Sequence, residues 1–104
     1  MNRHNRIQNL LQTELSPTFL LVENESGFHH VPEGSETHFK ITAVSTQFEG
    51  QTLVSRHRMV NHLLYDELES GLHALSLHLF TAAEWDKRQQ NVLKSPGCKD
   101  GFKK

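Results

Sequence analysis

LHALSLHLFTAAEW, residues 72–85, is the stretch that decides the fold of this chain of 104 residues. Its first part alternates between leucines and small or polar side chains, as a half-buried β-strand does. Thr81 and Glu84 then have the spacing of a capping box, in which each side chain accepts a hydrogen bond from the other residue's backbone amide. The stretch therefore predicts a strand over residues 72–80 that is followed at once by a helix.

The rest of the chain divides into helices and strands by the same criteria. Apolar residues at helical spacing predict helices over residues 2–15 and 55–70, and the helix that the capping box starts is expected to end before Pro96. Alternating stretches predict strands over residues 18–24 and 38–45. The order helix, strand, strand, helix, strand, helix predicts an α+β fold in which helices cover one side of a three-stranded sheet.

Length and composition favour one domain. With 36% hydrophobic residues the chain has enough apolar material for a single core, so we expect a domain over residues 1–95. Residues 96–104 lack periodicity and carry several lysines, which predicts a flexible basic tail. The sequence contains no signal peptide and no apolar run of about 18 residues, so we expect a cytoplasmic protein that does not use a membrane.

Eight histidines and one cysteine form an unusual set of metal ligands for a chain of this size. Histidine supplies a neutral nitrogen ligand for soft and borderline metals, whereas the single thiolate of Cys98 cannot hold an iron–sulfur cluster alone. Any metal that this chain binds is therefore expected to be shared with a partner protein.

Spacing excludes two of the histidine pairs as chelates. His57 and His62 lie five residues apart on a predicted helix, about 140° around its axis, so they cannot bind one ion together. His73 and His78 also lie five residues apart, and on a predicted strand this odd separation places them on opposite faces, so they cannot bind one ion together either. The remaining candidates are the loop residues His29 and His30, either of which could approach His73 to form an open site with two histidines.

At each of these positions, the alternative to a metal ligand is a histidine that binds no metal. His73 has the same strand parity as the core leucines and could be a hydrogen-bonded residue at the edge of the core. His29 and His30 could be ordinary loop residues.

Basic residues near the start of the helix over residues 55–70 are a second candidate site. Arg56, His57 and Arg58, with Lys40 on the polar face of a strand, could contact phosphates of DNA. The alternative is that these residues form an ordinary solvent-exposed helix face. The net charge of −1 also gives the chain no overall electrostatic attraction for nucleic acid.

No motif for catalysis is present. The sequence lacks a glycine-rich phosphate loop, a G-x-S-x-G elbow, a C-x-x-C pair and an H-E-x-x-H helix. We therefore expect a protein that is not an enzyme and has no small-molecule substrate.

Five short motifs occur in the order and spacing of the BolA family, over about residues 3–98. They are GSETHFK at residues 34–40, FEG at 48–50, RHRMV at 56–60, HALSL at 73–77 and TAAEW at 81–85. The chain therefore resembles the BolA family, and the resemblance implies a class II KH-like fold with a mixed sheet.

The resemblance also implies partners. Members of the family pair with monothiol glutaredoxins, either without a metal or through a bridging [2Fe-2S] cluster. In the bridged form, the glutaredoxin thiolate and glutathione bind one iron and histidines of the BolA protein bind the other. By motif, His73 corresponds to the invariant histidine of the family, and His29 occupies the place of the second ligand, with the adjacent His30 as the alternative.

Bacterial members of the family also resemble DNA-binding regulators of genes for stress response, cell shape, motility and biofilm. The helix that carries the RHRMV motif, residues 56–60, is the part implicated in DNA binding. Promoter DNA is therefore the second partner that the resemblance implies.

Overall fold

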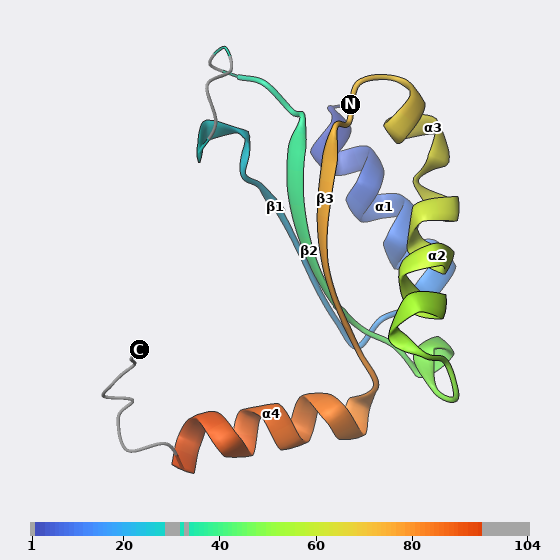
Figure 1. Ribbon diagram of the computed structural model, residues 1–104, viewed down its shortest axis with the longest axis vertical. Coiled ribbons are helices and arrows are strands. Elements are labelled where there is room, and N and C mark those ends of the chain that lie inside the picture. The colour runs from blue at the N-terminus through green and yellow to red at the C-terminus, as the bar shows by residue number, and fades with distance from the viewer. Residues whose placement is uncertain (1, 29–31, 33, 95–104) are drawn as a thin grey trace.

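The computed structural model describes residues 2–28, 32 and 34–94 (Figure 1). Its helices and strands are α1 (Arg3–Leu15), β1 (Phe19–Asn24), β2 (His38–Val44), α2 (Leu53–Leu63), α3 (Tyr65–Glu69), β3 (Ala74–Phe80) and α4 (Ala82–Lys94), with short 3₁₀ turns at Ser26–Phe28 and Thr46–Phe48. The predicted element order is confirmed, except that one predicted helix is divided in two. The expected tail, residues 96–104, lies outside the described residues.

The three strands form one mixed sheet with β2 in the middle. β1 runs antiparallel to β2, and β3 runs parallel to it. Because parallel neighbours need a long connection, the chain crosses from β2 to β3 through α2 and α3. His38 pairs with Ala74, so the beginnings of β2 and β3 lie side by side. The predicted fold class, α+β with a three-stranded mixed sheet, is confirmed.

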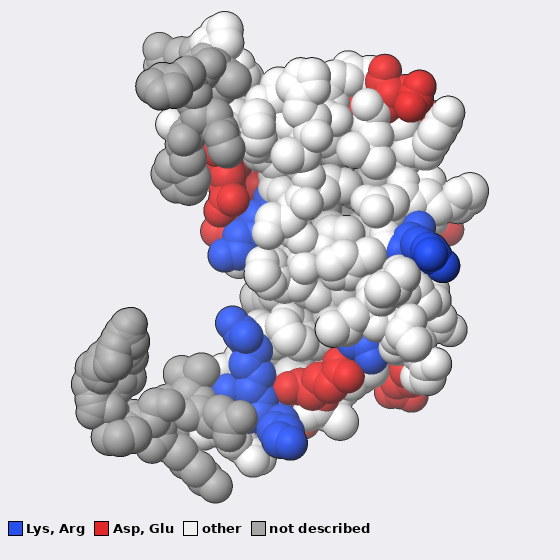
Figure 2. Space-filling view, viewed as in Figure 1, with Lys and Arg blue, Asp and Glu red and all other residues white. Residues whose placement is uncertain are grey.

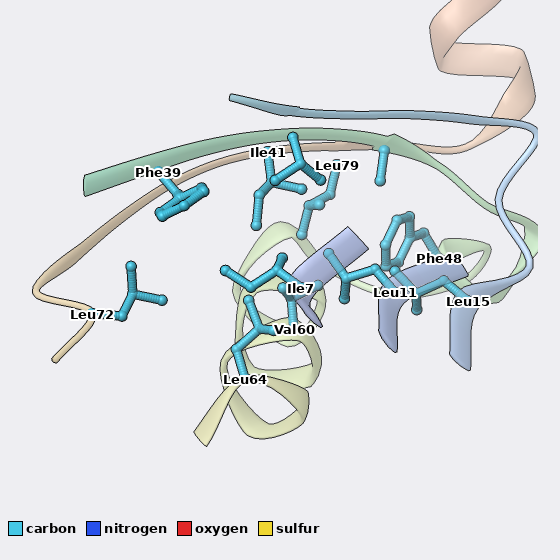
Figure 3. Packing of buried hydrophobic residues seen from close by; sticks show 12 residues of the cluster. Ile7, Leu11, Leu15, Phe39, Ile41, Phe48, Val60, Leu64, Leu72 and Leu79 are labelled. Atoms are coloured by element: carbon cyan, nitrogen blue, oxygen red, sulfur yellow. The ribbon is translucent and has the colours of Figure 1, made fainter. Parts of the chain in front are cut away.

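The core lies between one face of the sheet and the helices α1 and α2 (Figure 3). Its buried side chains come from both helices, the sheet and the turn after β2: Ile7, Leu11, Leu15, Phe39, Ile41, Phe48, Val60, Leu64 and Leu79. Because successive side chains of a strand alternate, Phe39 and Ile41 face this core. His38, Lys40 and Thr42 point to the opposite face of the sheet, the outer face.

The helix predicted over residues 55–70 is two helices. It begins earlier than expected because the hydroxyl of Thr52 caps it, accepting a hydrogen bond from the amide of Ser55 at 3.1 Å. It is interrupted at Leu64, whose side chain is fully buried while its backbone leaves the helical conformation. The interruption separates α2 from α3.

The position of α4 differs from the expectation that all helices cover one side of the sheet. Figure 1 shows α4 leaving the end of β3 and running away from α1 and α2. Trp85 of α4 stacks on Phe19 at 5.1 Å between ring centroids and contacts Phe80 at 5.3 Å. Both phenylalanines belong to the outer face, so Trp85 covers one end of that face and does not enter the main core.

Candidate functional site

His73 lies immediately before β3, at the end of the sheet where β2 also begins. Its backbone amide donates a hydrogen bond to the carbonyl oxygen of Thr37 at 2.8 Å, and the amide of Ala74 donates to the same oxygen at 3.1 Å. The side chain of His73 is exposed, and no hydrogen bond to its ring nitrogens occurs within the part of the chain that the structure describes. The sequence placed His73 inside the strand; the structure places it beyond the core, with its ring in solvent.

A second histidine, His38, lies beside His73. The two rings are 6.4 Å apart between centroids and meet edge to face, at an interplanar angle of 60°. His38 is the first residue of β2 and is half-buried on the outer face. Its Nδ1 lies 2.8 Å from the hydroxyl oxygen of Thr37.

A buried serine fixes the chain next to these histidines. Ser26 is only 3% exposed, and its hydroxyl oxygen accepts hydrogen bonds from the amides of Thr37 at 2.8 Å and His38 at 3.1 Å. The amide of Ser26 in turn donates to the side-chain oxygen of Asn24 at 3.0 Å. The backbone that carries His38 is therefore held from the end of β1 as well as by the sheet.

His29 and His30, the predicted loop ligands, lie outside the described residues. The loop that contains them leaves β1 at Asn24 and returns at His38, that is, at the end of the sheet that carries His73.

The described residues place two histidines next to each other at this end of the sheet, not a complete set of metal ligands. Within residues 2–28, 32 and 34–94, no group of three or more histidine, cysteine or carboxylate side chains is placed to hold a metal ion. An exposed imidazole next to a second one fits a metal group whose other ligands come from another molecule, because a structural site normally needs four ligands.

Sequence reasoning missed the position of His38. His38 is absent from the predicted set of ligands, because the parallel pairing of β2 with β3 cannot be seen in local periodicity. The only local signal is that His38 begins one strand and His73 directly precedes another.

Arg56, the first residue of the predicted DNA-binding set, is not on the solvent face. It is 5% exposed, and its guanidinium donates hydrogen bonds to the backbone oxygens of Gln51 and Leu79 at 3.0 and 3.1 Å. It also binds both carboxylate oxygens of Glu84 at 2.6 and 3.1 Å. The hydrogen bond from Arg56, supported by the backbone amide of Thr81, lowers the pKa of Glu84 to about 2.

The spacing of α2 explains this burial. Arg56 lies four residues before Val60 and eight before Leu64, and all three are buried. Residues at this spacing share one face of a helix, so the apolar stripe of α2 extends back to Arg56.

The other three residues of the predicted set do not form one surface with Arg56. Arg58 is exposed and His57 is half-buried on α2, whereas Lys40 lies on the outer face of the sheet, across the sheet from α2. Lys40 also pairs with Glu23 of β1 in the sheet register. Figure 2 accordingly shows lysine and arginine side chains in separate groups on the face drawn, and not as one basic patch.

Among the described helices, none has the length and apolar character needed to cross a membrane.

These observations define a small α+β protein with a mixed three-stranded sheet and two neighbouring histidines, one exposed and one half-buried, at one sheet end. The family model described as BolA-like protein matches residues 1–84. The chain belongs to the BolA family.

Relatives and solved structures agree with this assignment. The chain is 48% identical over 98 residues to the DNA-binding transcriptional regulator BolA of Vibrio cholerae, covering 94% of this chain and 92% of the relative. It is 45% identical over 94 residues to the protein of the same name in Escherichia coli, covering 90% of each. The structure of BolA1 from Arabidopsis thaliana matches with a TM-score of 0.76 at 48% identity, covering 81% of this chain and 96% of that one.

Proposed function

We propose that this protein is a non-catalytic regulator that pairs with a monothiol glutaredoxin and shares a [2Fe-2S] cluster with it. The observation that carries the proposal is the exposed ring of His73, which has no hydrogen-bond partner among the described residues and lies immediately before β3, at the end of the sheet where β2 begins. A histidine that only completed a core would be buried and hydrogen-bonded.

The chemistry of the ligands supports a shared cluster. Two histidines on one iron of a [2Fe-2S] centre are an established arrangement, and the other iron then takes two sulfur ligands. In this proposal the glutaredoxin thiolate and glutathione supply those sulfurs, and His73 is one nitrogen ligand. The family pattern assigns the second nitrogen ligand to His29, with His30 as the alternative.

The test is co-expression with a monothiol glutaredoxin, anaerobic purification of the complex and visible absorption and circular dichroism spectra. We expect His73→Ala to alter or abolish the cluster bands. The matched control is His62→Ala, because His62 is also exposed but lies on α2. Unchanged spectra for His73→Ala would remove that residue from the site.

The alternative function is regulation of transcription by binding promoter DNA, as the names of the bacterial relatives state for those proteins. On α2, the exposed Arg58 and the half-buried His57 are the residues of the predicted set that support it. Arg56 and Lys40 belong to the same hypothesis, but Arg56 is buried and bound to Glu84, and Lys40 lies across the sheet from α2.

Promoter binding at several salt concentrations tests this alternative. Each phosphate that the protein no longer neutralises reduces the slope of log affinity against log salt by about 0.9, so Arg58→Ala should weaken binding and flatten that slope. Lys40→Ala is the comparison for the outer face. Binding that both variants retain at the original slope would reject this basic set as the DNA-binding surface.

A further inference from the structure

We infer that His4 closes the free edge of β1 and keeps this strand from pairing with β1 of a second copy of the chain. The contact that carries this role is a hydrogen bond from the ring of His4, in the first turn of α1, to the backbone of Val22. Both residues are separate from those of the proposed function.

β1 lies at one edge of the sheet (Figure 1). The amide of Glu25, directly after β1, donates to the carbonyl oxygen of His38 at 2.7 Å. In an antiparallel pair, residues that exchange hydrogen bonds alternate with residues that do not. Counted back from Glu25, the backbone N–H and C=O groups of Leu20, Val22 and Asn24 therefore point away from β2. No described strand lies on that side, so these are the groups to which an added strand would bind.

The side chains of β1 give this edge little protection against a second strand. Phe19 and Leu21 are 38% and 44% exposed, and both lie on the outer face. Glu23 is the only charged side chain of β1, and it lies next to Lys40 in the sheet register. Exposed apolar edge strands with few charges pair readily with other strands unless something blocks them.

His4 supplies such a block at the middle of the strand. Its Nε2 lies 2.7 Å from the carbonyl oxygen of Val22, and because a carbonyl oxygen only accepts, the ring N–H is the donor. The ring is half-buried and lies 6.3 Å from that of Phe39 between centroids. The amide of His4 also donates to the carboxylate of Glu36 at 3.0 Å, which helps to fix the first turn of α1. The imidazole therefore occupies the position that an amide of a second strand would need.

The opposite edge of the sheet has the same kind of contact near its end. The amide of Ser45 donates to the carbonyl oxygen of Phe80 at 3.1 Å, so Phe80 faces β2 and Leu79 directs its carbonyl oxygen outwards. That oxygen accepts a hydrogen bond from the guanidinium of Arg56 at 3.1 Å. A side chain from a helix thus caps each edge strand: His4 from α1 on β1, and Arg56 from α2 on β3.

A second copy of β1 is the strand that fits the first of these edges. In an antiparallel pair about a two-fold axis with Leu20 opposite Val22, the two Leu21 side chains meet on the outer face and Glu23 lies opposite Phe19. The carboxylates of the two copies then do not oppose each other, and the exposed apolar side chains cover one another.

Sedimentation equilibrium of the full chain over a range of concentrations tests this role. In the unchanged chain a second strand has to displace His4 from Val22, whereas in His4→Ala it does not. One hydrogen bond corresponds to roughly a tenfold change in an equilibrium constant, so we expect the dissociation constant of the dimer to fall about tenfold or more in His4→Ala. Gln8→Ala, at an exposed position one turn later on α1, is the matched control and should behave as the unchanged chain. A His4→Ala chain that associates no more than the unchanged chain would overturn the inference.

Two further measurements identify the surface that associates. His4→Ala combined with Leu21→Lys brings two ammonium groups together in the β1 pair, and we expect this double variant to return to the monomer. In the dimer of His4→Ala, amide hydrogen exchange at Leu20 and Val22 should slow, since these amides point away from β2 in the monomer. A dimer that the double variant retains, or exchange that does not slow at these two amides, would place the association on another surface and overturn the inference.

A thermal melt checks that the variants fold. If truncation unfolds His4→Ala, His4→Leu takes its place, because leucine keeps an apolar group beside Phe39 but cannot donate to Val22. We expect the same gain in association from it.

Discussion

The guanidinium of Arg56 on α2 and the carboxylate of Glu84 on α4 bind each other through two hydrogen bonds, of 2.6 and 3.1 Å. The same carboxylate accepts the amide of Thr81 at 2.9 Å, and the amide of Glu84 donates to the hydroxyl of Thr81 at 3.2 Å. The predicted capping box is therefore confirmed, and it is joined to a residue of another helix. This connection fixes the direction in which α4 leaves the sheet.

Removing the charge of Arg56 should destabilise the fold. In Arg56→Met, the backbone oxygens of Gln51 and Leu79 lose their donors. We expect a decrease of about 2–3 kcal/mol in the free energy of unfolding, less than for a fully buried ion pair because Glu84 is half exposed. Urea unfolding followed by circular dichroism measures this decrease. Arg58→Met is the matched control, and its exposed side chain should change stability by less than about 0.5 kcal/mol. Equal effects of the two variants would contradict the buried role of Arg56.

The pH dependence of stability should reveal the same carboxylate. The pKa of Glu84 is lowered to about 2, chiefly by the hydrogen bond from Arg56. A carboxyl whose pKa is lower in the folded state stabilises the fold above its unfolded pKa and loses that contribution as the pH falls towards the folded pKa. We therefore expect Glu84→Gln to be less stable than the unchanged chain at pH 6, with the difference shrinking between about pH 4.5 and pH 2. Urea midpoints of both proteins across this range provide the measurement, and a difference that did not change with pH would contradict the ion pair.

Arg3 should contribute more to stability than its neighbour Arg6, although both bind Glu67. Arg3 has a side chain only 13% exposed and also donates to the backbone oxygens of Glu36 and Ser70, at 2.6 and 2.9 Å. The side chain of Arg6 is 44% exposed, where water weakens an ion pair.

We expect Arg3→Met to lower the free energy of unfolding by about 1–2 kcal/mol and Arg6→Met to lower it by less than Arg3→Met does. Thermal and urea unfolding of the two variants test this order. A larger loss of stability in Arg6→Met than in Arg3→Met would show that the contacts of Arg3 with Glu36 and Ser70 do not stabilise the N-terminal end of α1.

Trp85 should hold α4 against the outer face. Its ring stacks on Phe19 and contacts Phe80, and these contacts are partly exposed. We expect Trp85→Ala to lower the free energy of unfolding by about 1–2 kcal/mol, below the cost of a buried tryptophan. Amide hydrogen exchange should become faster over residues 86–94 while that of α1 changes little. Lys87→Ala, on the exposed part of the same helix, is the control. Unchanged exchange in α4 would show that the capping box alone holds this helix.

Local patterns predicted the elements of this fold well. The helix of residues 2–15 and the strand of residues 38–45 are found within one or two residues of their predicted ends. Both patterns depend on neighbours in sequence, since a strand alternates from residue to residue and a helix repeats every three or four. The break at Leu64 was missed, because a pattern that continues through Leu63, Leu64 and Leu68 gives no sign of a change in backbone direction.

The candidate sites were predicted less completely. His73 was singled out by its motif, and the structure places it exposed at the sheet end, while its role as a ligand stays a prediction. Arg56 was expected in solvent, and it is buried because the residue that neutralises it, Glu84, follows β3 far along the sequence. The place of His29 and His30 in the site stays a prediction.

The sequence by itself determined the strands, the helices apart from the break at Leu64, the capping box and the family of this protein, because each depends on residues that are close together along the chain. Only the tertiary structure decided that His38 meets His73 and that Arg56 meets Glu84. Both pairs form because β3 returns beside β2 after the crossover through α2 and α3, which brings distant residues together at the two ends of one parallel pair of strands.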